Sequence, residues 1–408
     1  MIPLLPFSLA LLLLPNLALA EPPIRPGDRI AIVGNTFADQ LRIHGYLETL
    51  LLQHTDSGPI SLRNLGWGGD MLTARDRPTN FPTEESTLQA HQTDVIIACF
   101  GMGESFAGPE GLEDFKDDLR AFLNSHQGKS YNGTSEVRLI LISPIAYESL
   151  GDLTPRHKER NAALEAYTLA MSEVASESSI PFVGLFAATR YLAEEWSEGN
   201  FTTNGIHLDE TGYWTVSRLI YDHLVGKPSS PWRIEIDAKS LNGTASGGSI
   251  SELIQKEDSV QFLLTEASPP SLAPPTDLPL PPQLEAKRDL LTVAHLDPGS
   301  YTLTVNGNFV VTADHLEWAN GIPIDASPAH QEAEALRAAI QEKNLQFTYS
   351  WKALNQVHIV GERRNSPSGR ALPAEVIEFN RLANELDQTL STKVSPKSRT
   401  WRLTSARQ

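Results

Sequence analysis

The sequence predicts an α/β protein, with a doubly wound parallel sheet in a three-layer α/β/α domain and a smaller mixed α+β region after it. Two features of the chain indicate this fold. Between residues 29 and 226, short runs of consecutive apolar residues alternate with longer amphipathic segments. Strands that are apolar on both faces are typical of a parallel sheet covered by helices on both sides. After residue 227 this alternation ends, and turn-rich and proline-rich segments begin.

The expected strands and helices of the first domain follow from these runs in chain order. Strands are expected at 29–34, 59–66, 94–101, 137–144 and 180–185. Helices are expected at 37–54, 111–126, 156–178, 188–196 and 209–225. In open parallel sheets, ligands bind beyond the carboxyl ends of the strands. The turns that follow these strands are therefore where the chemistry is expected.

The rest of the chain is expected to divide into two parts. Residues 227–288 form a β-rich segment that ends in the connector "ASPPSLAPPTDLPLPPQLEAK", whose prolines exclude a helix or central strand and predict a semi-rigid exposed chain. Residues 289–408 are expected to be a mixed α+β region. Its expected elements are alternating strands around the turn Asn306-Gly307, a helix over 327–344 with Ser327 as N-cap and Pro328 as first residue, a strand over 355–364 and a helix over 373–391.

The charge and the cysteine content exclude some classes of function. The chain has 33 basic and 50 acidic residues, which give a net charge of −17. Nucleic acids and anionic membranes are themselves polyanions, so neither is expected as a partner. The single cysteine, Cys99, cannot form an intramolecular disulfide, and its apolar surroundings in "DVIIACF" predict a place in the core.

The first twenty residues, "MIPLLPFSLALLLLPNLALA", predict export of the protein. They contain no charged side chain, and the leucine-rich run ends in "ALA", with small residues where a signal peptidase cleaves. We expect a signal peptide that is cleaved after Ala20 and a periplasmic or extracellular protein. An uncleaved membrane anchor is the alternative, which the prolines and the short apolar core disfavour.

Four turns at the expected carboxyl edge of the sheet carry glycine and small polar residues. They are Gly34-Asn35-Thr36, "NLGWGGDML" at 64–72, "FGMGESFAG" at 100–108 and "TTNGIHLDETGYW" at 202–214. Each turn alone is uninformative, because a glycine-rich turn or a lone histidine is usually structural. Their order and their shared position at strand ends carry the information.

In this order and position, the four turns resemble the four sequence blocks of the SGNH (GDSL-like) hydrolases, over residues 28–226. The resemblance implies the SGNH-hydrolase, flavodoxin-like fold and an ester hydrolase. Thr36 stands where the family has its serine nucleophile, and His207 stands where it has its base. Gly69 matches the oxyanion-hole glycine. Gly103 replaces the asparagine that would donate to the oxyanion, and Asn204 replaces the aspartate partner of the base.

These replacements have chemical consequences. A threonine hydroxyl attacks an ester only if a base such as His207 removes its proton. Asn204 could orient the imidazole through its carbonyl oxygen, but it brings no negative charge. The backbone N–H groups of Thr36 and Gly69 would still hold an oxyanion, whereas the missing asparagine at Gly103 removes a donor worth ~3 kcal/mol. The site is therefore expected to be either a weakened hydrolase or an inactive one.

Other polar residues beside the altered blocks are candidate accessories. Asn35, Glu104 and Ser105 lie next to Thr36 and Gly103 in the chain, and the Ser105 hydroxyl is a candidate surrogate for the missing donor. Asp39 lies one turn into the first expected helix. Its simpler interpretation is a favourable charge at a helix N-terminus.

A closer resemblance is to exported SGNH-type proteins of planctomycete-like bacteria. It rests on "GNTFADQLRIHGYLETLL", "LGWGGDML" and "NGIHLDETGYW". It implies that threonine in the first block is the pattern of that group, so that Gly103 is the departure of this chain. Some of these proteins carry haem-attachment domains, but this chain has no Cys-x-x-Cys-His. No metal or organic cofactor is expected.

Three functions remain open. The first is an ester hydrolase that removes O-acyl groups from extracellular carbohydrate. The second is a catalytically inactive module of the same fold that binds carbohydrate or protein, and a scaffold or redox-partner role is a weaker third. In the C-terminal region, "YSWKALNQVHIVGERR" at 349–364 gathers aromatic, amide and basic side chains that suit a sugar. An ordinary domain interface is the favoured interpretation of that segment.

Overall fold

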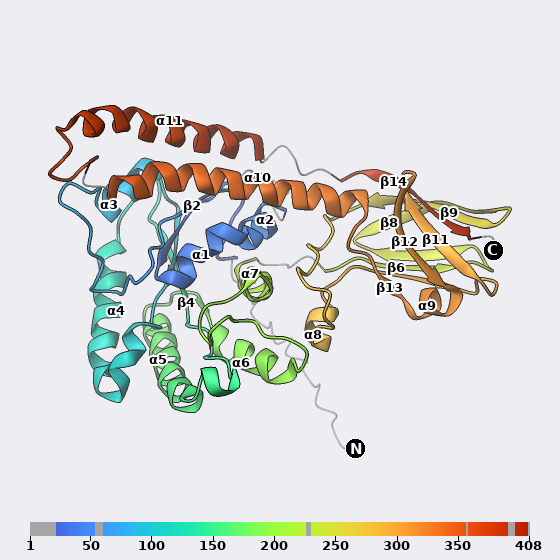
Figure 1. Ribbon diagram of the computed structural model, residues 1–408, viewed down its shortest axis with the longest axis horizontal. Helices are drawn as coiled ribbons and strands as arrows, with labels where there is room; N and C mark the ends of the chain where they lie inside the picture. The colour runs from blue at the N-terminus through green and yellow to red at the C-terminus, as the bar shows by residue number, and fades with distance from the viewer. Residues whose placement is uncertain (1–21, 54–59, 226–229, 356–357, 391–395, 407–408) are drawn as a thin grey trace, which may run out of the picture.

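The computed structural model shows an α/β domain and a β-sandwich, connected by a long helix that leaves the sandwich and runs along the α/β domain (Figure 1). It describes residues 22–53, 60–225, 230–355, 358–390 and 396–406. The predicted signal peptide, residues 1–20, lies outside the described residues. None of the helices in these ranges combines the length and the apolar character that a membrane span requires.

The sheet of the α/β domain has five parallel strands in the order β2-β1-β3-β4-β5. This order confirms the predicted doubly wound fold, because the chain moves outward from β1 in both directions. The strands are β1 (Arg29–Gly34), β2 (Ser61–Asn64), β3 (Val95–Cys99), β4 (Arg138–Ile142) and β5 (Phe182–Val183).

Helices cover both faces of this sheet, as the continuous apolar strands require. Successive residues of β1 alternate between two cores: Ile30 and Ile32 pack on one side, and Ala31 and Val33 pack on the other. The first core is covered by α1 (Thr36–His44), α2 (Tyr46–Gln53), α6 (Leu185–Glu195) and α7 (Glu210–Leu224). The second is covered by α3 (Glu84–His91), α4 (Leu112–His126) and α5 (His157–Glu177). Short 3-10 helices occur at Glu104–Gly111 and Gly151–Leu153.

The single helix predicted over 37–54 is two helices, α1 and α2. Gly45 ends α1 with a φ of 70°, and its N–H bonds to the carbonyl of Leu41. This left-handed conformation favours glycine and turns the chain. The break matters for the site, because it leaves the last carbonyl groups of α1 open to donors from elsewhere in the chain.

The β-sandwich consists of two sheets with the strand orders β13-β10-β6-β7 and β12-β11-β14-β9-β8. Both sheets draw strands from before and after residue 288, so the predicted division at that residue cuts through them. Trp232, Phe262, Trp318 and Trp401 fill the core between the sheets. The elements are β6 (Arg233–Asp237), β7 (Asn242–Ser246), β8 (Gly248–Lys256), β9 (Ser259–Glu266), β10 (Leu290–Ala294), β11 (Ser300–Val305), β12 (Asn308–Asp314), α9 (His315–Asn320), β13 (Ile322–Pro323) and β14 (Ser398–Ser405).

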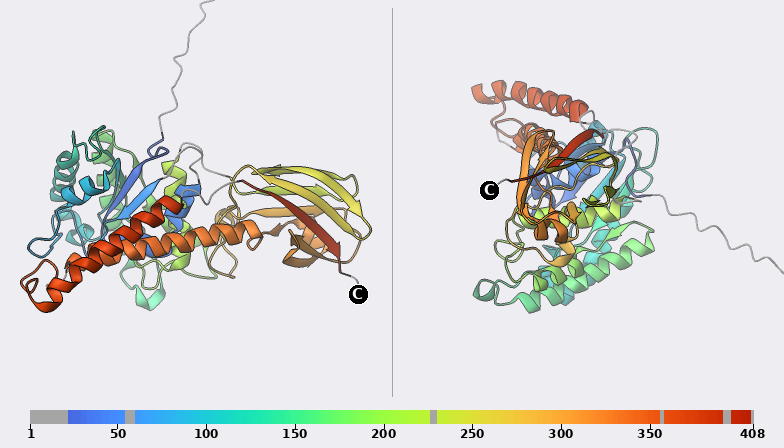
Figure 2. Two further views of the ribbon diagram at one scale, coloured as in Figure 1. Left: turned by 90° about the horizontal axis from the view of Figure 1, so that it is seen from above. Right: turned by 90° about the vertical axis from the view of Figure 1, so that its right-hand side faces the viewer.

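Two long helices, α10 (Pro328–Trp351) and α11 (Pro367–Leu390), form an arm that leaves the sandwich and lies along the α/β domain (Figure 2). The predicted start of α10 is confirmed, with Ser327 as N-cap and Pro328 in the first turn. A 3-10 turn at Lys352–Asn355 follows α10. The strand predicted over 355–364 is wrong: residues 358–364 are turns at the tip of the arm, where the apolar alternation meets no neighbouring strand among the described residues.

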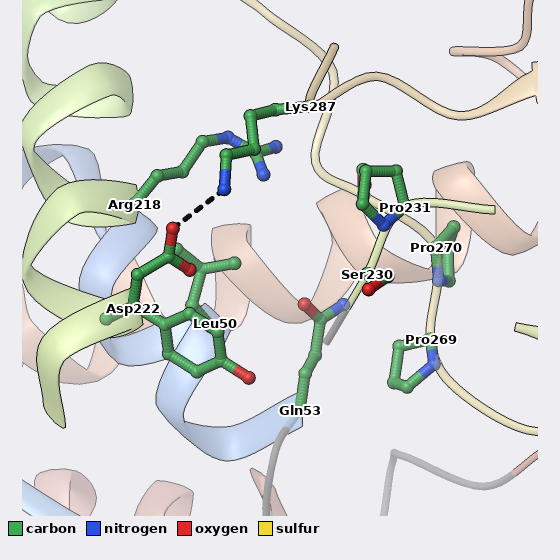
Figure 3. A pocket seen from close by; sticks show the side chains of 11 residues that line it. Leu50, Gln53, Arg218, Asp222, Ser230, Pro231, Pro269, Pro270 and Lys287 are labelled. Atoms are coloured by element: carbon green, nitrogen blue, oxygen red, sulfur yellow. Dashed lines mark hydrogen bonds and ion pairs between the residues drawn. The ribbon is translucent and has the colours of Figure 1, made fainter. Parts of the chain in front are cut away.

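The proline-rich connector packs against the α/β domain, so the prediction that it is exposed is wrong. It includes a short helix, α8 (Pro282–Glu285). Leu272, Leu280 and Leu284 are buried, and the indole N–H of Trp214 donates to the carbonyl of Leu272 over 3.1 Å. Figure 3 shows the crevice where the connector meets α2 and α7, with Lys287 paired to Asp222. The prolines here hold an extended chain against a surface instead of keeping it in solvent.

Candidate active site

A cavity of about 160 Å³ opens at the carboxyl ends of β1, β3 and β4. Thr36, Gly69, Gly103 and His207 all line it, so the structure brings these four predicted site residues together. Most of the remaining wall is apolar. It includes Phe37, Met71, Phe100, Met102, Pro144, Ile145 and Ile206.

The turn after β1 places Thr36 as the first residue of α1. Gly34 has a φ of 136°, and a Cβ atom there would lie 2.2 Å from the carbonyl oxygen of Cys99. The Asn35 N–H donates to that same carbonyl over 3.3 Å, and the Asn35 side chain accepts from the Phe37 N–H over 3.0 Å. Asn35 therefore caps the helix, while the N–H of Thr36 has no partner among the described residues.

The loop after β2 brings Gly69 beside Thr36. The Asn64 side chain donates to the carbonyl of Ala38 over 2.6 Å and accepts from the Gly66 N–H over 2.9 Å. A Cβ atom on Gly68 would lie 3.6 Å from the hydroxyl oxygen of Thr36. The N–H of Gly69 also lacks a partner within the described part of the chain. Two unpaired N–H groups thus border the cavity, as an oxyanion site requires.

Trp67 anchors this loop through contacts with the C-terminal arm. Its ring lies between the guanidinium of Arg77, at 4.3 Å, and the ammonium of Lys352, at 4.7 Å from the ring centre. Arg77 also binds both carboxylate oxygens of Asp70, at 3.0 and 2.7 Å. Lys352 pairs with Asp39 in α1 over 2.6 Å. Asp39 therefore does more than place a charge at a helix start, because it joins α1 to the arm.

The same arm holds the other end of α1. Arg337 donates to the carbonyl of His44 over 3.0 Å, Gln341 to that of Ile43 over 2.9 Å, and Asn344 to that of Arg42 over 3.3 Å. These carbonyls are the ones that a helix C-terminus leaves without intrahelical donors. Helix α10 consequently fixes α1 at both ends, and with it the position of Thr36. Sequence spacing gave no sign of this, because about three hundred residues separate the partners.

The third block differs from the prediction at two residues. Both carboxylate oxygens of Glu104 accept from backbone, over 2.9 Å from the Leu72 N–H and 2.8 Å from the Gly101 N–H. Ser105 is fully buried, and its hydroxyl donates to the carbonyl of Met102 over 2.8 Å. Neither side chain is at the mouth of the cavity, so the interpretation of Ser105 as a surrogate donor is wrong. Both residues are structural ties of this loop.

Met71 occupies the space beside Gly103. A Cβ atom on Gly103 would lie 2.9 Å from Cγ and 3.0 Å from the sulfur of Met71. A thioether therefore fills the position where an asparagine side chain would begin. This replacement removes a hydrogen-bond donor from the cavity and adds apolar wall.

The histidine block gives the most consequential difference from the prediction. The side-chain oxygen of Asn204 accepts from the N–H of His207 over 2.9 Å and from that of Ile206 over 3.3 Å. Its amide nitrogen faces Nδ1 of His207 at 2.9 Å. The expectation that Asn204 orients the ring through its carbonyl oxygen is therefore wrong. The oxygen is already used by the backbone, and only the NH₂ group meets the imidazole.

Glu148 organises this block, and sequence reasoning missed it. This buried carboxylate accepts from the N–H and the hydroxyl of Thr202 and from the N–H of Phe201. The Thr202 hydroxyl oxygen accepts in turn from the Gly205 N–H over 3.0 Å. Burial raises the pKa of Glu148, while these hydrogen bonds lower it. A lone glutamate after β4 carries no spacing signal that could have revealed this role.

Thr36 and His207 share the cavity, but no hydrogen bond joins their side chains within the described residues. His207 is exposed at the mouth, and Thr36 is half-buried beneath it. Catalytic hydrogen bonds are often longer in a free enzyme than in its substrate complex. Their catalytic roles, and that of Gly69, stay predictions.

Comparison with known proteins agrees with this geometry. Residues 27–215 match the GDSL-like Lipase/Acylhydrolase family. A gut microbial diltiazem-metabolizing enzyme shares the fold with a TM-score of 0.69 at 17% identity, over 95% of this chain and 99% of that one. Two solved esterases also align over about half of this chain. An acetylxylan esterase from Geobacillus stearothermophilus is 15% identical, with a TM-score of 0.37, over 49% of this chain and 95% of that one. The acetyl xylan esterase AlAXEase is 16% identical, with a TM-score of 0.37, over 48% of this chain and 100% of that one.

No curated protein matches the chain significantly. The likeness to the gut microbial enzyme extends over the α/β domain, the sandwich and the arm, so this whole arrangement recurs in another protein. The resemblance to planctomycete proteins stays a prediction. Residues 27–215, which match the model of the GDSL-like lipase/acylhydrolase family, contain the four blocks and the parallel sheet.

Proposed function

We propose that the α/β domain is a slow hydrolase of carboxylic esters, with Thr36 as nucleophile and His207 as base. One observation carries this proposal: a hydroxyl, an imidazole and two unpaired backbone N–H groups line the same cavity. The family match supports the hydrolase class. These are the groups that acyl transfer needs.

The reaction would proceed in two balanced halves. In the tautomer of His207 that leaves Nε2 unprotonated, the Thr36 oxygen attacks the ester carbonyl carbon and its proton passes to Nε2, while the N–H groups of Thr36 and Gly69 hold the oxyanion. The C–O bond to the alcohol then breaks, and the alcohol leaves with the proton from Nε2. A water repeats the sequence on the acyl-threonine and releases the acid.

The substrate class follows from the cavity and from the predicted export. An apolar space of about 160 Å³ suits a short acyl chain, with the alcohol part outside the mouth. An exported hydrolase would meet O-acyl groups on extracellular carbohydrate, which we propose as the substrate. The reaction needs no metal or organic cofactor.

A non-catalytic binding module is the second candidate. Two observations favour it: Met71 fills the space of an oxyanion donor, and the amide of Asn204 faces the ring where a carboxylate would be needed. In the well-studied serine proteases, replacing the aspartate partner by asparagine lowers turnover by about 10⁴.

Hydrolysis of p-nitrophenyl acetate tests the proposal. The wild type, Thr36→Ala and His207→Ala are compared, with His295→Ala in the β-sandwich as a matched control. We expect slow turnover in the wild type and the control, and none above background in the two site variants. Turnover that survives in His207→Ala would exclude the proposed mechanism. A wild type that is inactive on a panel of short acyl esters would favour the binding module.

A further inference from the structure

We propose that Asn204 is a positioning residue that fixes His207 in the tautomer with its proton on Nε2, so that the resting cavity is a receptor for a short carboxylate. This inference rests on the site of the proposed function, but it does not depend on turnover. The inferred ligand is the short carboxylic acid in its deprotonated form, bound in the cavity before any reaction.

The first step of the argument is the direction of the Asn204 amide. Two backbone N–H groups, those of Ile206 and His207, point at one end of the amide at 3.3 and 2.9 Å. Only the oxygen can accept from them, so the NH₂ group must face Nδ1 of the ring. An NH₂ group has no lone pair to offer. Nδ1 must therefore be the acceptor, and the ring proton of neutral His207 lies on Nε2.

The second step is the rigidity of the loop that carries both residues. Gly205 adopts a φ of 93°, and its N–H is held by the hydroxyl of Thr202. Its carbonyl accepts from the Glu148 N–H over 2.8 Å, while the Thr203 N–H donates to the carbonyl of His207 over 2.9 Å. The loop cannot follow a rotation of the Asn204 amide without losing these bonds. The amide direction is therefore built into the fold.

The third step is the character of the polar groups that border the cavity. Within the described ranges, the cavity groups without a hydrogen-bond partner include the N–H groups of Thr36 and Gly69 and, in this tautomer, Nε2–H of His207. Asp70 also lines the cavity, but both of its oxygens are bound by Arg77. Donors at one end and apolar wall around Met71 and Met102 suit a carboxylate with a short alkyl chain.

The same tautomer explains why the site would be a poor hydrolase. A general base needs a lone pair on the nitrogen that faces the nucleophile, and here that nitrogen already carries a proton. In an aspartate triad the carboxylate accepts from Nδ1–H and leaves Nε2 free. Asn204→Asp would keep one oxygen for the two backbone N–H groups and offer the other to Nδ1–H. This single change would let His207 act as a base, because its Nε2 would no longer carry the ring proton.

The first experiment reads the tautomer directly. Long-range ¹⁵N–¹H NMR of histidine-labelled protein at pH 8.5 reports which ring nitrogen carries the proton, and the signals of His207 are assigned by their loss in His207→Ala. We expect the proton on Nε2 in the wild type and on Nδ1 in Asn204→Asp. The exposed Asn242→Asp in the β-sandwich is the matched control and should resemble the wild type. A wild-type proton on Nδ1 would overturn the inference without any variant.

The second experiment measures the receptor by calorimetric titration with acetate, propionate and butyrate at pH 8.5. We expect binding by the wild type and Asn242→Asp, and at least tenfold weaker binding by Asn204→Asp. The new carboxylate in Asn204→Asp could also weaken binding by repelling the ligand. Repeating the titration at high salt tests this, because salt screens charge repulsion but does not restore the lost Nε2–H donor. Equal binding by wild type and Asn204→Asp would contradict the inference. If Asn204→Asp changes the tautomer but shows no esterase activity, the inference about the tautomer is supported. The same result would contradict the proposal that Thr36 is the nucleophile.

Discussion

The two sides of the cavity differ in how fully they match what a hydrolase needs. On the oxyanion side, the amides of Thr36 and Gly69 are presented by a capped helix and a loop that Trp67, Arg77 and Lys352 hold in place. On the proton-transfer side, the geometry of the loop is equally firm, but an amide stands where a carboxylate would be. In the proposed site, recognition of an acyl group and the chemistry performed on it would therefore depend on different parts of the fold.

The two sides of the cavity are also held by different parts of the protein. The oxyanion side depends on α10 and the turn after it, which belong to the C-terminal arm. The proton-transfer side depends on Glu148 and is complete within the α/β domain. Changes in the arm should therefore affect one side only, and changes at position 204 the other.

The largest expected effect is a gain of function in Asn204→Asp. With Nε2 free to accept a proton, turnover of p-nitrophenyl acetate should rise by up to about 10⁴, the factor by which the reverse change lowers turnover in serine proteases. Steady-state kinetics of the variant and of the double variant with Thr36→Ala measure it. The gain should vanish in the double variant. A gain that persists without the Thr36 hydroxyl would mean that another nucleophile is used.

A smaller gain is expected from rebuilding the missing donor. Gly103→Asn alone should not help, because its side chain would collide with Met71. Combined with Met71→Ala, it should raise kcat by about tenfold, since one oxyanion donor is worth roughly 3 kcal/mol at its best. Met71→Ala alone is the control. An equal gain from that control would show that the added space matters, and not the amide.

Loosening the arm should cost activity without unfolding the protein. Lys352→Met removes the ion pair with Asp39 and one face of the Trp67 contact, so the Gly69 loop should become less well placed. We expect kcat to fall about fivefold with KM little changed, an effect on the order of 1 kcal/mol. Lys129→Met, far from the cavity, is the matched control. A rise in KM with constant kcat would instead assign Lys352 to substrate binding.

The last prediction concerns how the arm docks on the domain. His91 bonds to Ser61 over 3.1 Å, and Ser61 donates to Asp387 of α11 over 2.8 Å. Burial, followed by the charge of Arg63, lowers the pKa of His91 from its ordinary value of 6.5 to about 3. The unfolded chain then binds a proton that the folded protein does not. The free energy of unfolding should therefore fall as pH drops from about 6.5 towards 3, by up to ~1.4 kcal/mol per pH unit.

Urea unfolding at several pH values measures this slope against His91→Gln, which should show a flatter dependence. Carboxylates also titrate below pH 5, so the difference between the two proteins is the relevant quantity. His223→Gln, at an exposed histidine of α7, should match the wild type. Identical slopes for the wild type and His91→Gln would show that His91 does not control the docking of α11.

The sequence predicted the sheet and the meeting of Thr36 with His207 because both depend on local patterns. Apolar runs mark buried parallel strands, and turns after such strands converge on one edge. The direction of the Asn204 amide could not be predicted from the sequence, because it depends on which backbone N–H groups of the folded loop need an acceptor. Met71 beside Gly103 and Lys352 beside Trp67 were also out of reach, since packing between distant segments leaves no periodic signal. The apolar alternation in 355–364 misled because a strand requires a partner strand.

The order of strands in the sandwich has a consequence for how the protein is made. The last strand, β14, lies in the middle of its sheet, between β11 and β9. During synthesis, β9 and β11 must wait for residues 398–405 before their inner edges are paired. Until residues 398–405 have been made, the nascent chain exposes two open strand edges, which are sites of aggregation.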